Sequence, residues 1–179
     1  MIYLFLAEGF EEIEALATVD VLRRAEIEIR TVSITDSYRV IGSHGIEVTA
    51  DKLFGEISAD ADMYILPGGM PGTLNLGAFS PLCELLEKAN DEGRFIAAIC
   101  AAPSVLGGLG FLKGKKATCY PGFEDKLIGA EFSTESVVVS DNIITSRGAG
   151  TAHLFGFKLV ELLKNSETAE NLKKGMLYE

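Results

Sequence analysis

Short apolar runs of strand length recur along the chain and alternate with segments of helical composition. The runs at Ile2–Ala7, Met63–Leu66 and Phe95–Ile99 are nearly or wholly apolar, as expected for strands that are covered on both faces. Glu28–Ile34 alternates apolar and polar residues and is predicted as a further strand. Strands that alternate with helices favour a mostly parallel sheet with helices on both faces. The pattern therefore predicts an α/β fold, with a single domain over residues 1–179.

Besides a helix expected to begin after Cys100, four helices and two hairpins are predicted. Helices are predicted over Glu11–Ala25, Ser80–Glu92, Thr151–Lys164 and Thr168–Met176. The second helix is expected to start with Ser80 as its N-cap and Pro81 in its first position. Hairpins are predicted over Tyr38–Val48 and around Asp141-Asn142, which would form a two-residue turn between β-prone runs.

Charge and composition exclude several classes of protein. The 26 acidic and 16 basic residues give a formal net charge of −10. An acidic chain without a basic stripe is repelled by phosphate backbones, so nucleic acid is not expected as a partner. No apolar run is long enough to cross a bilayer, so no membrane partner is expected either. The N-terminus lacks the basic segment of a secretory signal, and a cytoplasmic location is the resulting prediction.

The three cysteines indicate reduced thiols rather than a disulfide framework or a zinc site. Their number is odd and no CxxC pair occurs. Cys83 stands among leucines in a predicted helix and Cys119 stands in a short β-prone run. Both are interpreted as core thiols, because free cysteine is among the most buried residue types.

The third cysteine, Cys100, stands where a predicted strand meets the start of a predicted helix. In open α/β sheets, ligands bind beyond the carboxyl ends of the strands. A side chain at a sharp strand-to-helix turn is presented to solvent, as in a nucleophile elbow. The partial positive charge of a helix N-terminus also favours thiolate over thiol. Cys100 is therefore a candidate reactive thiol, and the alternative is an ordinary core thiol.

Glu14 and two glycines are the other candidate site features. Glu14 heads a mostly apolar row of its helix, and poor solvation would favour its protonated form. The alternative is a first-turn acid that interacts with the helix dipole. Gly68 and Gly69 follow a strand and either expose backbone N–H groups to an oxyanion or form a plain turn. The GAGTAH segment at 148–153 lacks the third glycine of a dinucleotide fingerprint, so no dinucleotide cofactor is predicted.

Four sequence segments resemble those of the ThiJ/PfpI superfamily, in the same order and spacing. They are AEGFEEIEALATVDVLRRA, YILPGGMPGTLNL, IAAICAAPSVL and ITSRGAGTAH. The chain is most similar to the DJ-one-like branch, named for the parkinsonism-associated protein, over essentially its whole length. The resemblance implies a flavodoxin-like three-layer sandwich with a mostly parallel sheet, a cysteine nucleophile elbow and a homodimer.

The resemblance also implies roles for individual positions. It implies that Cys100 is the reactive cysteine and that a protonated Glu14 hydrogen-bonds its sulfur. The backbone N–H groups of Gly69 and Ala101 are implied as the donors around the thiol, where they would stabilise an oxyanion.

Three positions depart from the pattern of relatives. Tyr120 stands where animal members usually have a pocket histidine, and His44 stands in place of a pocket-rim arginine contributed by the partner subunit. Ala149 stands where many relatives have proline. Tyr120 and His44 are therefore expected in or near the pocket, without an assigned role in the chemistry.

Three classes of function compete. The first is a stress-response enzyme of the glyoxalase or deglycase kind, a lyase or hydrolase that acts on small aldehydes or glycated substrates. It would use Cys100 as nucleophile and Glu14 to move protons, with no metal or cofactor expected. The second is an oxidation sensor or redox-regulated chaperone that uses the same cysteine. The third, a peptidase or glutamine amidotransferase, is disfavoured, because Ala101 replaces the peptidase histidine and His153 does not begin a His-x-Glu motif.

Overall fold

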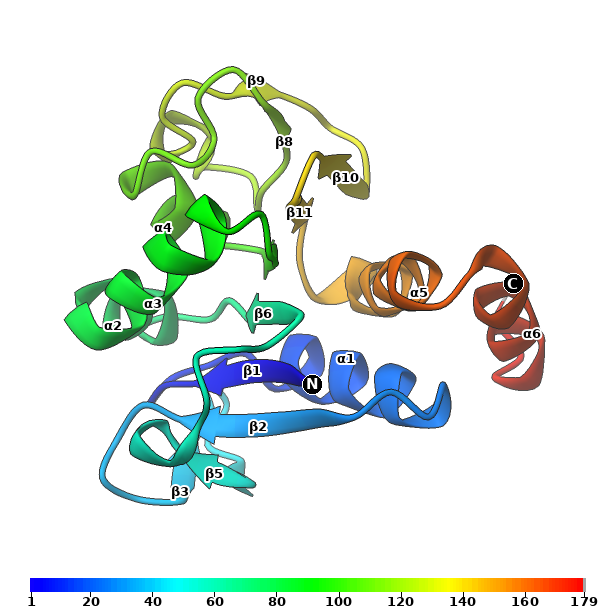
Figure 1. The fold of residues 1–179 in the computed structure, drawn as a ribbon, viewed down its shortest axis with the longest axis horizontal. Helices are drawn as coiled ribbons and strands as arrows, with labels where there is room; N and C mark the ends of the chain where they lie inside the picture. Colours follow the sequence, from blue (N-terminus) through cyan, green and yellow to red (C-terminus); the bar gives the residue numbers. More distant parts are fainter. Residues whose placement is uncertain (179) are drawn as a thin grey trace.

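A seven-stranded sheet forms the centre of the computed structural model, which describes residues 1–178 (Figure 1). Its strands are β1 (Ile2–Leu6), β2 (Ile29–Ser33), β5 (Lys52–Leu53), β6 (Met63–Leu66), β7 (Phe95–Ile99), β10 (Val137–Ser140) and β11 (Ile143–Ser146). Their order is β10-β11-β7-β6-β1-β2-β5. All neighbours pair in parallel except β10 and β11, which form an antiparallel hairpin.

Two small sheets and six helices surround this sheet. β3 (Arg39–Ile41) and β4 (Glu47–Thr49) pair antiparallel, whereas β8 (Lys116–Ala117) and β9 (Glu131–Phe132) pair in parallel. The helices are α1 (Glu12–Arg24), α2 (Gly72–Ala78), α3 (Ser80–Asp91), α4 (Pro103–Gly108), α5 (Ala152–Leu163) and α6 (Ser166–Gly175). Three short 3₁₀ turns occur at Phe54–Glu56, Glu124–Lys126 and Ala149–Thr151.

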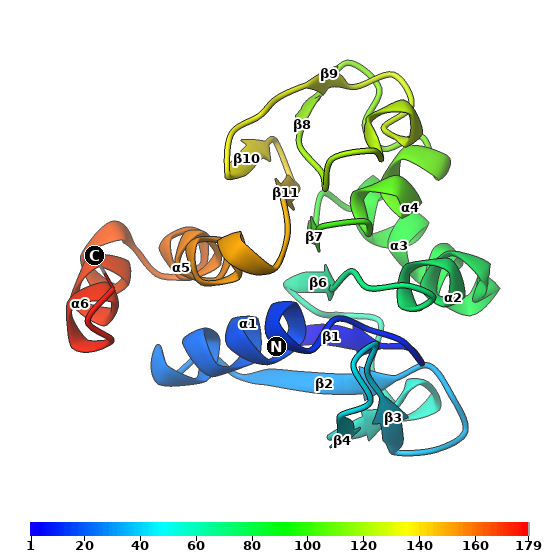
Figure 2. The ribbon, with the colours of Figure 1, turned by 180° about the vertical axis from the view of Figure 1, so that it is seen from behind.

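The helices cover both faces of the central sheet. Helices α1 and α5 lie on one face, with α6 outside α5, and α2, α3 and α4 lie on the other (Figures 1 and 2). Successive side chains of a strand point to opposite faces. In β1, Leu4 and Leu6 therefore join the core under α1, whereas Tyr3 and Phe5 join the core under α3. The result is a flavodoxin-like α/β sandwich, as predicted.

Most predicted elements are confirmed, whereas α2 and the short strands β5 and β9 were not predicted and the start of α3 differs. Helix α2 was not predicted, because its sequence GTLNLGA carries two glycines and follows a proline-glycine turn. Ser80 is not an N-cap: α2 ends directly before Phe79, which caps α3 without a side-chain hydrogen bond, so Ser80 is the first residue of α3. No helix within residues 1–178 has both the length and the apolar character needed to cross a membrane.

Candidate active site

Cys100 stands directly after β7 and three residues before α4, with a backbone φ of 65°. A residue other than glycine is strained in this left-handed region. Two hydrogen bonds from distant segments hold the strained backbone. The Cys100 N–H donates to the Ser146 carbonyl at 3.0 Å, and the Tyr120 N–H donates to the Cys100 carbonyl at 2.8 Å. The half-buried thiol is thus presented at the carboxyl edge of the sheet on a strand-to-helix elbow, where the sequence predicted it.

Glu14 lies beside this thiol, inside the protein. Its side chain is 1% exposed, and the Gly68 N–H donates to its Oε2 at 2.8 Å. A Cβ on Gly68 would lie 2.7 Å from both Cys100 Cβ and Glu14 Oε2. Only glycine therefore allows the end of β6, the thiol and the carboxyl group to meet at this point. The second carboxyl oxygen, Oε1, has no hydrogen-bond partner within residues 1–178.

Burial controls the acidity of this pair. It raises the pKa of Glu14 to about 7, although hydrogen bonds with Cys100 and from the Gly68 N–H oppose the rise. Burial, followed by the charge and the hydrogen bond of Glu14, raises the pKa of the Cys100 thiol to about 12. The direction is opposite to that predicted from a helix N-terminus, and burial is the largest cause.

The two acids are coupled, so the thiol cannot be considered apart from Glu14. When Glu14 carries a proton, it repels no charge and donates to the sulfur instead of accepting from it. Of the causes that raise the thiol pKa, burial alone then remains, against the N–H groups of Ala101 and Gly69. A protonated Glu14 therefore favours the thiolate form of Cys100 more than an ionised Glu14 does.

Ala101 and Gly69 are the residues whose backbone N–H groups the resemblance implies as donors to the thiol. Both N–H groups lower the pKa of the Cys100 thiol. Gly69 has a φ of 93°, and a Cβ there would lie 2.4 Å from the backbone nitrogen of Glu11. Only glycine can therefore hold this N–H against the thiol while the loop passes the start of α1.

A cavity of about 270 Å³ lies next to Cys100, and Tyr120, Arg147 and Gly148 are among the residues that line it. A Cβ on Gly148 would be 3.9 Å from the Cys100 sulfur and 3.2 Å from the Tyr120 ring. Tyr120 is thus a pocket residue, as expected. Arg147 was missed by the sequence analysis. Its Nε is buried, and Arg147 makes no hydrogen bond or ion pair through its side chain within residues 1–178.

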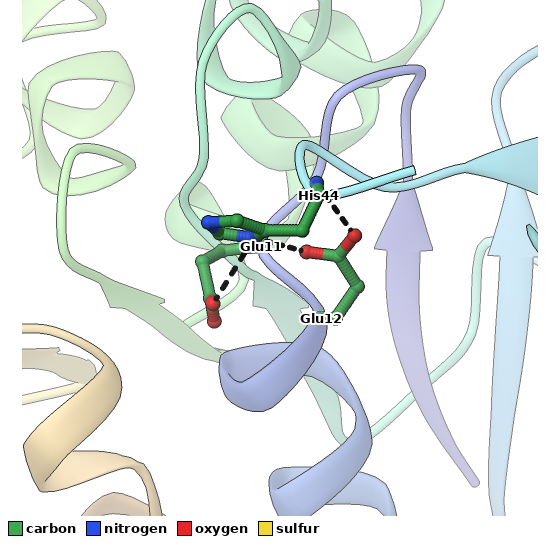
Figure 3. A group of neighbouring side chains, drawn as sticks. All are labelled: Glu11, Glu12 and His44. Carbon is green, nitrogen blue, oxygen red and sulfur yellow. Dashed lines mark hydrogen bonds and ion pairs between the residues drawn. The ribbon is translucent and has the colours of Figure 1, made fainter. Parts of the chain in front are cut away.

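His44 lies in the β3–β4 hairpin and packs against the start of α1, together with Glu11 and Glu12 (Figure 3). Its Nδ1 is 2.8 Å from Glu12 Oε2, and its backbone N–H donates to Glu12 Oε1 at 2.7 Å. Burial alone would raise the pKa of Glu12, but the hydrogen bonds from His44 and Ile46 lower it to about 2. His44 does not line the cavity beside Cys100 of its own chain.

The cluster of Glu11, Glu12 and His44 has the spacing of a metal site, since its ligand atoms lie within 4.8 Å of one another. Both carboxylate oxygens of Glu12 already accept hydrogen bonds, however, from backbone and side-chain donors of the hairpin. The side-chain hydrogen bond to Glu12 and the charge of Glu12 raise the pKa of His44. An ion pair that anchors the hairpin to α1 therefore accounts for the cluster without a metal ion.

The other two thiols differ from each other. Cys119 is fully buried, as predicted, and burial raises the pKa of its thiol to about 11. The core interpretation of Cys83 is wrong, because its side chain is half-buried and lines a cavity between α2, α3 and α4. Helix α3 buries Leu82, Leu86 and Ala89, and Cys83 falls beside that row rather than on it.

Comparisons with known proteins found one matching family and several relatives. The DJ-1/PfpI family matches residues 1–162. Protein dj-1beta of Drosophila melanogaster is 37% identical over 96% of this chain and 94% of its own. Protein DJ-1 homolog B of Arabidopsis thaliana is 41% identical over 92% of this chain, which spans only 38% of that longer protein. A glutathione-independent glyoxalase of Caenorhabditis elegans, DJR-1.2, is 34% identical over 93% of this chain and 90% of its own.

Solved structures of related proteins have the same fold as this chain. The structure of oxidized Toxoplasma gondii DJ-1 superposes with a TM-score of 0.95, at 38% identity over 99% of this chain and 97% of the other. Drosophila melanogaster DJ-1beta superposes with a TM-score of 0.94, at 35% identity over 99% of this chain and 97% of the other.

Proposed function

Because the chain belongs to the DJ-1/PfpI family, we propose that it is a cysteine-dependent enzyme acting on small reactive carbonyls, of the glyoxalase or deglycase kind. The observation that carries the proposal is the pair formed by Cys100 and Glu14, a buried acid whose pKa is raised to about 7. An acid of this pKa exists in both protonation states near neutral pH and can therefore move protons. The name of the glyoxalase relative supports the same chemistry.

The proposed reaction converts a 2-oxoaldehyde and water into a 2-hydroxy acid. The Cys100 thiolate adds to the aldehyde carbon, and the carbonyl oxygen takes the proton of Glu14, which gives a hemithioacetal. The Glu14 carboxylate then removes the proton from that carbon and returns it to the neighbouring carbon. The hemithioacetal hydroxyl loses its proton and the neighbouring oxygen gains one, which gives the thioester of a 2-hydroxy acid. Water then hydrolyses the thioester and restores the thiol. The N–H groups of Gly69 and Ala101 stabilise the oxyanion that forms in the addition and hydrolysis steps.

The cavity beside Cys100 accommodates the remainder of such a substrate. Its volume of about 270 Å³ suits a small carbonyl compound. The guanidinium of Arg147, which has no ion-pair partner in the described chain, complements the carboxylate that the reaction forms.

A second candidate function is an oxidation sensor or redox-regulated chaperone. The structural relative from Toxoplasma gondii is described as oxidized. In this chain, the free Oε1 of Glu14 beside Cys100 gives an oxidised sulfur a hydrogen-bond partner. The two functions use the same residues, so only measurements of turnover separate them.

We also propose that the chain forms a homodimer through α1 and the β3–β4 hairpin. Ile13, Leu16 and Ile46 expose 54%, 39% and 54% of their surface. Ile13 and Ile46 line one cavity of about 210 Å³ together with His44. A second copy of the chain would cover this apolar surface and bring His44 near the partner's pocket.

The decisive experiment measures turnover of methylglyoxal, glyoxal and phenylglyoxal by the wild type and by Cys100→Ser, with trace metals chelated. Turnover is expected in the wild type, and its loss is expected in Cys100→Ser. The control is Cys119→Ala, which removes a buried thiol and should keep the activity. Glu14→Gln should fold and lose turnover, since an amide cannot move the proton. Protection of client proteins by the wild type without turnover would favour the sensor and contradict the enzyme.

A further inference from the structure

Arg147 is the one arginine without a carboxylate partner in residues 1–178. The chain contains six arginines and 26 acidic residues. The other five arginines each form an ion pair with an aspartate or a glutamate, namely Arg23, Arg24, Arg30, Arg39 and Arg94. Arg147 makes no ion pair and no hydrogen bond through its side chain within the described residues. Because acidic partners are abundant in this chain, its guanidinium is available to a carboxylate from outside the chain.

The Arg147 side chain belongs to the cavity of about 270 Å³ that lies beside the thiol. Arg147 follows β11 directly and lines this cavity together with Tyr120. Two positions earlier, the Oγ1 of Thr145 accepts the Thr118 N–H at 3.0 Å. Side chains two positions apart along a strand lie on the same face. The Arg147 side chain therefore leaves the sheet on the side where the chain runs from Thr118 to Tyr120.

The end of the guanidinium can be reached by a bound molecule. Arg147 is half-buried, and Nε is the side-chain nitrogen that is buried without a partner. Nη1 and Nη2 also have no hydrogen-bond partner within residues 1–178, but they are not among the buried atoms, so they remain accessible. A guanidinium presents its N–H groups in a planar fork that matches the two oxygens of a carboxylate. Arg147 can therefore bind a carboxylate through its two Nη atoms.

The cavity carries a single charge, and that charge is positive. No acidic residue lines it, and the nearby Glu14 is 1% exposed and lies inside the protein. Most of the surface of a chain with a net charge of −10 repels anions, whereas this cavity attracts them. A Cβ on Gly148 would lie 3.9 Å from the Cys100 sulfur. A molecule bonded to the sulfur therefore lies beside the residue that follows Arg147.

We propose that this site prefers 2-oxoaldehydes that carry a carboxylate of their own, and that Arg147 binds this carboxylate while Cys100 adds to the aldehyde carbon. The inference rests on the proposed function and names the class of its substrates. 4,5-Dioxopentanoate is a compound of this class. Its aldehyde carbon is oxidised to a carboxylate and its keto carbon is reduced to an alcohol. Water supplies the added oxygen and one proton is released, which gives 2-hydroxyglutarate.

Substrate preference is measured with 4,5-dioxopentanoate and with its methyl ester, which has the same carbon chain but no charge. In the wild type, kcat/KM should be about tenfold higher for the anion, as expected for a hydrogen bond between charged groups. Arg147→Gln should remove this preference, and Arg147→Lys should keep part of it, because lysine retains the charge but not the planar fork. The control is Arg94→Gln, which removes a positive charge directly before β7, at the opposite end of that strand from Cys100, and should keep the preference.

Binding of a carboxylate by Arg147 is also tested without turnover, through alkylation of Cys100 by iodoacetate and by iodoacetamide. In both reactions the thiolate displaces iodide from the equivalent carbon, and only iodoacetate carries a carboxylate. Peptide mass mapping measures the two rates at Cys100. The ratio of the iodoacetate rate to the iodoacetamide rate should fall about tenfold in Arg147→Gln and stay unchanged in Arg94→Gln.

An unchanged ratio of alkylation rates in Arg147→Gln overturns the inference, whether or not the protein turns over any carbonyl compound. A wild type that turns over the methyl ester as well as the anion also overturns it, and this result does not depend on how a variant folds. Absence of turnover with both compounds, together with the expected fall in the alkylation ratio, contradicts the proposed enzyme and supports Arg147 as a residue that binds carboxylates.

Discussion

Replacing Glu14 by glutamine should change how the stability of the protein depends on pH. Glu14 has an ordinary pKa of 4.5 and a pKa of about 7 in the folded protein, mainly because it is buried. At about 1.4 kcal/mol for each pKa unit, this difference corresponds to about 3 kcal/mol. Glutamine has nearly the same shape and can accept the hydrogen bond from the Gly68 N–H, but it does not titrate.

The sign follows from proton binding. Between pH 4.5 and about 7, Glu14 keeps its proton in the folded chain and loses it in the unfolded chain. The folded state therefore binds more protons, and the free energy of unfolding of the wild type falls as pH rises through this window. The stability that the neutral carboxyl group contributes is fully present below pH 4.5 and lost above about pH 7.

Urea unfolding of both proteins at pH 4, 6 and 8, followed by circular dichroism, measures the effect. Relative to the wild type, Glu14→Gln should gain about 3 kcal/mol between pH 4 and pH 8. The exposed Glu167→Gln controls for the loss of one negative charge from a chain of net charge −10. A difference between Glu14→Gln and the wild type that is the same at all three pH values would refute the argument that burial raises the pKa of Glu14.

Three further predictions concern the thiols, the dimer and the hairpin. Limited peroxide should add two oxygen atoms to Cys100 while Cys83 and Cys119 stay reduced, which peptide mass mapping measures. Modification of Cys83 or Cys119 before Cys100 would contradict the assignment of Cys100 as the reactive thiol. The protein should sediment as a dimer at micromolar concentration and Ile13→Glu as a monomer, and a monomeric wild type would remove the proposed interface. The bond to Glu12 raises the pKa of His44, so the ion pair is present at pH 5.5 and lost at pH 8.5. His44→Ala should therefore lower the melting temperature more at pH 5.5 than at pH 8.5. An equal decrease in melting temperature at both pH values would contradict the role of the ion pair.

The sequence predicted an element correctly where its formation depends on neighbouring residues in the chain. The runs that form β1 and β7 are apolar at successive positions, and the sheet covers both of their faces. The sequence-based prediction failed at α2. The glycines of this segment are typical of a loop, and its helical form depends on packing between β1, α3 and α4. The prediction also failed at Cys83, because a shift of one position on a helix separates the core from a cavity wall.

The site was predicted in part. The position of Cys100 at a strand end followed from pattern, and the family resemblance implied Glu14, Gly69 and Ala101 around it. Arg147 was missed, because nothing in the SRGAG segment distinguishes an arginine with an ion-pair partner from one without. The direction of the Cys100 pKa was also missed, since the helix-dipole argument is local and burial is not.

The sequence by itself determined most of the segments that become strands and helices and which residue stands at the elbow, because hydrophobic periodicity and turn residues act over a few positions. Only the tertiary structure decided the chemistry of that residue. The strained backbone of Cys100 is held by Ser146 and Tyr120, and the pKa of its thiol is raised first by burial and then by Glu14. These three residues come from distant parts of the chain. Burial and contacts between remote segments control a pKa, and they exist only after the sheet has brought those segments together.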